Sequence, residues 1–173
     1  MAERDCDTAE GDVNASPKKC IFCDIIAQND PAKIVKQGEK FVIVKDIHPV
    51  ATHHFLVLSR DHIATAKSLQ PTPKDRELLD CMYGAAKQVL LDNGVDTLSN
   101  SRFGFHWPPF YSVGHLHLHA ISPVSSMAWY CRYIQFNTTM SFCFVDVNYV
   151  RKRIGCIVDK TEESDCSIEK NKL

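Results

Sequence analysis

The stretch His115-Leu116-His117-Leu118-His119 decides the fold. Alternate side chains of a β-strand point to opposite faces, so the three imidazoles share one face of a predicted strand. Leu116, Leu118 and Ile121 are expected to help fill a core. Burying three titratable rings side by side costs stability unless each ring binds a metal, an anion or a hydrogen-bonding partner. The stretch is therefore interpreted as an active site in a central strand.

The composition is that of one ordinary globular domain. The 173 residues are 45% hydrophobic and 24% charged, with a formal charge of −1. This charge argues against an extended nucleic-acid-binding surface but is compatible with a local anion pocket. No apolar run approaches the roughly 20 residues that span a membrane, and residues 1–5 lack a signal core. Without an export signal, the eight cysteines are interpreted as reduced thiols. The expected localisation is cytoplasmic and nuclear.

Local composition divides the chain into four parts. Residues 1–17 are polar and acidic, which predicts a disordered leader, and residues 159–173 predict a flexible tail. Residues 18–125 form the expected domain. Residues 126–158 form a C-terminal extension that is expected to pack on this domain or on a dimer.

The apolar pattern predicts an α+β fold. Strands are expected at 34–35, 41–44, 54–58 and around Phe103 and Phe105, besides the histidine strand. A long helix is expected from the N-cap Thr72 to the stop signal Asn93-Gly94, with shorter helices at 20–26 and 145–154. These elements predict an antiparallel five-stranded sheet, a long helix on one face and a short N-terminal helix.

Four segments, in the correct order, resemble the histidine triad family. The histidine run matches the pattern His-φ-His-φ-His-φ-φ, where φ is apolar. Residues 20–26 resemble the usual opening of the family, 41–49 resemble a strand that leads to an Asp-Ile-x-Pro turn, and 52–63 resemble a Thr-His-x-Leu-Val-Ile-Pro-Lys-x-His segment. The resemblance covers residues 18–125 and is strongest to the Hint branch of nucleotide-binding proteins.

The resemblance implies a HIT-like fold and a nucleoside 5′-phosphoramidate hydrolase, of the adenosine 5′-monophosphoramidase type. Its substrates would be AMP-amine and AMP-lysine conjugates and aminoacyl-adenylates. His117 would attack the α-phosphorus and form a covalent nucleotidyl-histidine. His119 would donate to a nonbridging phosphate oxygen, Ser112 would help the leaving amine take its proton, and His54 would support the triad. A backbone carbonyl near His115 is expected to fix the tautomer of His117.

The resemblance also implies the nucleotide-binding residues. The carboxylate of Asp46 would accept from the ribose hydroxyls, and Ile47 would pack on adenine. The remaining expected nucleotide-binding residues are Phe110, Tyr111, Ser112, His117 and His119. Residues 107–111 replace the Gly-rich loop of many Hint proteins with Trp-Pro-Pro-Phe-Tyr, which predicts a stiffer loop and a shifted leaving-group preference.

Cys20 and Cys23 have the spacing of half a tetrahedral zinc site. Two simply buried thiols are the alternative, and the sequence leaves both readings open. In the reading with zinc, the resemblance implies His62 and His115 as the other two ligands. The metal would then be structural and would pin the N-terminal segment to the sheet, while the chemistry itself requires no cofactor.

Two other functions are compatible with the same motifs. One is an aprataxin-like hydrolase that removes adenylate from DNA ends, because residues 104–110 and the Ser112-x-x-His115 spacing also resemble the aprataxin catalytic domain. The other is a nucleotide-binding scaffold without significant turnover. The expected partners are purine nucleotide conjugates of AMP and a second copy in a homodimer, built from the long helix and an edge strand. Neither membrane nor nucleic acid is an expected partner.

Overall fold

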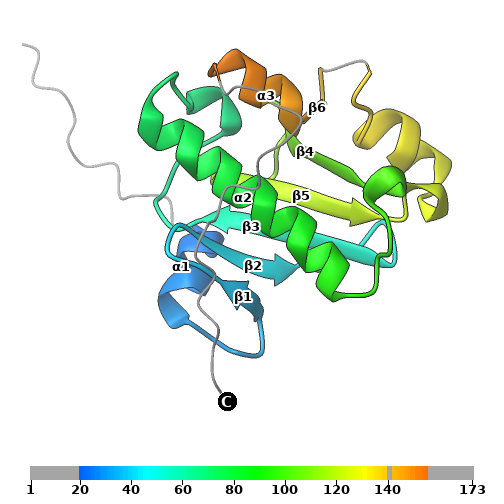
Figure 1. Cartoon of the computed structure of the whole chain (residues 1–173), viewed down its shortest axis with the longest axis horizontal. Helices are drawn as coiled ribbons and strands as arrows, with labels where there is room; N and C mark the ends of the chain where they lie inside the picture. The colour runs from blue at the N-terminus through cyan, green and yellow to red at the C-terminus, as the bar shows by residue number, and fades with distance from the viewer. Residues whose placement is uncertain (1–19, 140–141, 156–173) are drawn as a thin grey trace, which may run out of the picture.

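The computed structural model describes residues 20–139 and 142–155, which form one antiparallel sheet with helices on both faces (Figure 1). The strand order is β1-β2-β3-β5-β4-β6. The strands are β1 Ile34–Gln37, β2 Phe41–Lys45, β3 His53–Ser59, β4 Arg102–His106, β5 His117–Ser122 and β6 Phe144–Asp146. The helices are α1 Ile21–Gln28, α2 Pro73–Asp92 and α3 Val147–Arg153, with short helical turns at Ala66–Ser68, Leu98–Asn100, Val124–Ser126 and Cys131–Gln135.

The long helix α2 lies across one face of the sheet (Figure 1). It begins as predicted, because the Thr72 hydroxyl accepts a hydrogen bond from the backbone N–H of Asp75 at 3.2 Å and Pro73 occupies the first helical position. Its buried face, which includes Leu79 and Met82, packs against apolar side chains of five strands. Those strand residues are Phe41, Ile43, Phe55, Val57, Phe103, Phe105, Leu118, Ala120 and Val145.

The opposite face of the sheet carries two separate covers. The helix α1 packs over β2 and β3, where Phe22 and Ile25 contact a cluster of Val42, Val44, Leu56 and Leu58. At the other end, Ile121 packs in a cluster with Val124, Met127, Cys131, Phe136 and Phe144. Ile121 is therefore buried as expected, but it lies on the histidine side of the sheet and not in the α2 core with Leu116 and Leu118. The histidines lie between the two covers.

The α+β class is confirmed, whereas the prediction of five strands is wrong. The sixth strand, β6, pairs with β4 in the register Gly104↔Asp146 and Phe105↔Val145. Three residues are too short for an alternating pattern to mark a strand, so the sequence predicts only a helix here. That helix, α3, begins two residues later than expected, because the Asp146 carboxylate accepts from the backbone N–H of Asn148 at 2.8 Å and caps it.

The predicted leader 1–17 and tail 159–173 lie outside the described residues, as do residues 156–158. The thiols of Cys20, Cys23, Cys131 and Cys143 are free. Cys81 on α2 is disulfide-bonded, so the expectation of reduced thiols is wrong at that residue. Over the described ranges, every helix is too short or too polar to cross a membrane.

Candidate active site

Four imidazoles meet on the sheet face that lies away from α2. His117 and His119 extend from β5, and both are buried as their alternation with leucine predicts. The neighbouring strands add one histidine each, His54 from β3 and His106 from β4. The ring centroids of adjacent members lie 4.8 to 5.2 Å apart. The pleat of three paired strands thus builds a single cluster.

The tautomer of His117 is determined by the backbone. Its Nδ1 lies 2.6 Å from the carbonyl oxygen of His115. A carbonyl only accepts, so Nδ1 carries the proton and Nε2 keeps an unshared electron pair. This contact confirms the expectation of a tautomer-fixing carbonyl near His115. His117 presents one basic nitrogen, as a nucleophile requires.

A relay of hydrogen bonds determines the tautomer of His119. The backbone N–H of Val50 donates to Nδ1 of His54 at 3.3 Å, so the proton of His54 sits on Nε2. That Nε2 lies 2.9 Å from Nδ1 of His119 and donates to it. His119 must then carry its own proton on Nε2, an atom that is buried and has no hydrogen-bond partner among the described residues. A buried, unused N–H is suited to bind an anion that enters the site.

His106 was not among the predicted site residues. Its ring stands perpendicular to that of His119, with centroids 4.8 Å apart, and its Nδ1 is buried without a partner in the described chain. The sequence did contain the signal. Because Phe103 and Phe105 face the α2 core, the alternate positions 104 and 106 must face the histidines.

Burial keeps these rings neutral. It lowers the pKa values of His54, His115 and His117, and it lowers that of His119 well below the usual 6.5. It also lowers the pKa of His106 to about 4, with a smaller opposing effect from a hydrogen bond to the Cys143 backbone. Neutral imidazoles at physiological pH are what both the nucleophile and the tautomer relay require.

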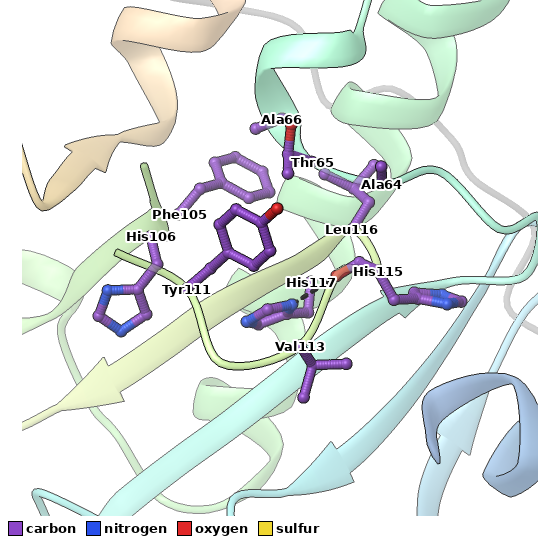
Figure 2. A pocket seen from close by; sticks show the side chains of 10 residues that line it. All are labelled: Ala64, Thr65, Ala66, Phe105, His106, Tyr111, Val113, His115, Leu116 and His117. Carbon is purple, nitrogen blue, oxygen red and sulfur yellow. Dashed lines mark hydrogen bonds between the residues drawn. The ribbon is translucent and has the colours of Figure 1, made fainter. Parts of the chain in front are cut away.

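A shallow, open pocket lies where β4 ends and β5 begins (Figure 2). His106, Tyr111, His115 and His117 are among the side chains that line it, and Tyr111 points into it from the loop before β5. Of the other loop residues predicted for the site, Ser112 is exposed and is not part of this lining. Phe110 is half exposed, and its ring lies 5.5 Å from that of Phe142.

The predicted nucleoside-binding pair lies just after β2. The carboxylate of Asp46 accepts from the backbone N–H of His48 at 2.8 Å, and its other oxygen lies 3.3 Å from Nε2 of His54. Ile47 is 86% exposed, so its side chain is free to contact a ligand. The structure therefore brings Asp46 to the histidine cluster and leaves Ile47 open to solvent.

The four predicted metal ligands converge at the junction of α1 and the sheet. Nδ1 of His115 lies 3.4 Å from each of the Cys20 and Cys23 sulfurs, and Nδ1 of His62 lies 3.3 Å from the Cys23 sulfur. All four ligand atoms lie within 4.8 Å of one another. A tetrahedral zinc with its usual bond lengths separates nitrogen and sulfur ligands by about 3.5 Å. The donor set and its spacing fit that ion.

The second nitrogen of His115 supports this fit. Its Nε2 lies 2.8 Å from the carbonyl oxygen of Ser59 and donates to it. Nδ1 is then unprotonated and directed at the two thiols. Zinc-binding histidines commonly donate their other N–H to a carbonyl in this way.

Comparison with known proteins agrees with this geometry. Residues 19–133 match the family model described as "Scavenger mRNA decapping enzyme C-term binding". The chain is 40% identical over 116 residues to adenosine 5′-monophosphoramidase HINT3 of Xenopus tropicalis, covering 66% of this chain and 74% of that protein. It is 35% identical over 138 residues to the Mus musculus protein of the same name, covering 78% and 81%.

Aprataxin and the solved structures extend the comparison. The chain is 34% identical over 96 residues to aprataxin of Gallus gallus, covering 56% of this chain but only 29% of aprataxin. A HIT family hydrolase from Clostridium thermocellum superposes with a TM-score of 0.54 at 29% identity, covering 61% of this chain and 91% of the hydrolase.

Proposed function

This chain belongs to the histidine triad family and to its Hint branch, and from that membership we propose that it hydrolyses nucleoside 5′-phosphoramidates as an adenosine 5′-monophosphoramidase. The substrates are AMP-amine and AMP-lysine conjugates and aminoacyl-adenylates. The observation that carries the proposal is the contact of 2.6 Å between Nδ1 of His117 and the His115 carbonyl. It leaves the basic Nε2 of a buried, neutral imidazole as the attacking atom.

The reaction takes two displacements at phosphorus. Nε2 of His117 attacks the α-phosphorus, the P–N bond to the amine breaks, and the amine leaves with a proton. Water then attacks the nucleotidyl-histidine, which releases AMP and restores the neutral imidazole. During both steps negative charge develops on the nonbridging oxygens, where the unpartnered Nε2–H of His119 is available to donate.

The surrounding residues are assigned supporting roles. His54 is a positioning residue, because it holds His119 in the donor tautomer. Asp46 and Ile47 bind the ribose and the base, and Phe110 and Tyr111 contribute to nucleotide binding from the loop before β5. Ser112 supplies the hydroxyl through which the leaving amine takes its proton. The exposed Ser112 must move toward the pocket to do so.

Zinc is proposed as a structural ion on Cys20, Cys23, His62 and His115. When bound, it would tie α1 to the start of β5 and hold the carbonyl of His115, the acceptor for His117. The ion takes no part in the displacements themselves. The chemistry proceeds on the side chains of the protein.

A fluorogenic AMP-amine phosphoramidate tests this function. We expect turnover by the wild-type chain, a trapped mass adduct of AMP on His117, and loss of both in His117→Ala. The matched control is His53→Ala. His53 lies on β3, the strand beside β5, but its ring stacks on Phe55 on the α2 side of the sheet, away from the histidine cluster. Binding of AMP by the wild type without turnover would instead indicate a nucleotide-binding scaffold. A faster reaction with 5′-adenylated DNA would indicate the aprataxin-like function.

A further inference from the structure

The C-terminal extension brings two phenyl rings against the histidine cluster. The ring of Phe136 lies 5.4 Å from His119, 5.7 Å from His54 and 5.0 Å from His106. The ring of Phe144 lies 5.8 Å from His119 and 5.3 Å from His106. Both phenylalanines are almost fully buried, at 2% and 0% exposure. The reaction proposed above uses neither ring.

Phe136 is anchored to the same sheet that carries the histidines. The Arg102 guanidinium, at the start of β4, donates from one nitrogen to the carbonyl oxygens of Phe136 at 2.6 Å and Arg132 at 2.9 Å. The backbone N–H of Phe136 donates to the carbonyl of Cys131 at 2.9 Å. Because Arg102 pairs with Ile121 on β5, the anchor lies two residues along the strand from His119. The ring of Phe136 is thus placed by charge-assisted hydrogen bonds as well as by apolar packing.

Gly104 makes room for the second ring. It pairs with His119 on one side and with Asp146 on the other, and it faces the histidine cluster. A Cβ atom at this position would collide with the carbonyl oxygen of Val145 and with the ring of Phe144. The missing side chain therefore allows β6 to dock and lets Phe144 fill the space beside His119.

Phenyl rings at this place have a defined physical effect on the cluster. They offer no strong hydrogen bond and exclude water, so they disfavour a protonated imidazole and leave His119 only the partner supplied by His54. The titratable groups that face His119 are Asp46, His54, His106 and His117. Water in the place of the phenyl rings would compete with His54 for the hydrogen bond to His119.

We infer that Phe136 is a positioning residue for the proposed reaction, because its ring seals the rear of the cluster and keeps His119 in its donor tautomer. The inference rests on the proposed function for its consequence in catalysis. The effect of Phe136 on the imidazole of His119 does not depend on that function. Phe144 completes the same wall from β6.

The test measures the histidine rings directly. In Phe136→Ala we expect the pKa of His119, followed by NMR of the imidazole Cε1–H, to rise toward its usual 6.5, because water then reaches the ring. Phe136→Leu keeps an apolar side chain and should give a smaller rise. The matched control is Phe103→Ala, another buried phenylalanine whose ring lies 5.4 Å from Tyr83 on the α2 side. That control should lose stability without moving the titration of His119.

The rate of the phosphoramidate reaction supplies a second measurement. Protonation of His119 places a proton on Nδ1, which can then no longer accept from His54. A raised pKa therefore breaks this hydrogen bond at a higher pH, and Phe136→Ala should lose roughly threefold more activity in kcat/KM at pH 5 than Phe103→Ala does. Titration curves of His119 that coincide in wild type, Phe136→Ala and Phe103→Ala would overturn the inference. If the titration moves while no phosphoramidase activity exists, the proposed function fails and the sealing role of Phe136 stands. Phe136→Leu decides the question if Phe136→Ala does not fold.

Discussion

At the scale of single residues, the direction of one hydrogen bond controls the site. The Val50 N–H donates to Nδ1 of His54, so Nε2 of His54 carries the proton and donates to His119. His54 therefore acts through His119 and not on the substrate. A glutamine at position 54 can still accept from Val50 and donate to His119, whereas a leucine cannot. We therefore expect His54→Leu to lower kcat roughly tenfold, equivalent to one hydrogen bond of about 1.4 kcal/mol, with little change in KM. His54→Gln should retain more of the rate. Equal kcat values for the two variants in steady-state assays would argue against the relay.

His106 makes a prediction about stability. Its pKa is about 4 in the folded chain and near 6.5 when unfolded, so the unfolded state binds more protons between these pH values. Its contribution is fully present above pH 6.5 and is lost as the pH falls toward 4. The expected loss is on the order of 3 kcal/mol of unfolding free energy. Urea denaturation at pH 7.5 and pH 4.5 should show this loss in the wild type and a smaller one in His106→Gln. A loss of the same size in both would contradict the assignment.

At the scale of elements, α1 depends on its junction with the sheet. None of its residues is fully buried, and its first residue is capped by no side chain. A zinc ion on Cys20, Cys23, His62 and His115 would hold the start of α1 to the sheet. We expect about one zinc per chain by elemental analysis, and a lower Tm both in Cys23→Ser and after chelation with phenanthroline. Cys143→Ser changes a free thiol away from the junction and is the control. Purified chain without zinc whose Tm is insensitive to chelators would favour the reading as buried thiols.

The elements also show how far the sequence could predict this molecule. The histidine strand and α2 were predictable, because alternation with leucine and a Thr-Pro cap are local signals that act within one element. The residues that act with His117, and the group of two cysteines and two histidines at the possible zinc site, were predicted from the family resemblance. Phe136, Phe144 and β6 were not, since their roles depend on tertiary contacts with Arg102 and Gly104 that no local period records. His106 lies between these cases, because strand alternation alone would have placed it on the histidine face.

At the scale of the whole molecule, β6 and α3 decide which sheet edges remain open. β6 covers the outer edge of β4, and α3 packs beside α2, where Arg151 donates to Asp80 at 2.8 Å. The sheet edges are therefore β1 and β6, so a homodimer that extends the sheet has to use one of them. We propose β1, where Val35 is 40% exposed. Light scattering should report a dimer for the wild type and a monomer for Val35→Lys, since an edge charge opposes strand pairing. A wild-type monomer would contradict the expected dimer.

The position of Gly104 opposite Phe144 has a consequence for how the protein is made. All the family motifs, including the triad, leave the ribosome before the residues that wall in His119. A nascent chain that ends before Phe136 thus carries every catalytic side chain while the rear of the histidine cluster is open to water. Catalytic activity should then arise late in translation, when β6 docks on β4. Until then the edge of β4 is unpaired, and an incomplete chain should be more susceptible to proteolysis.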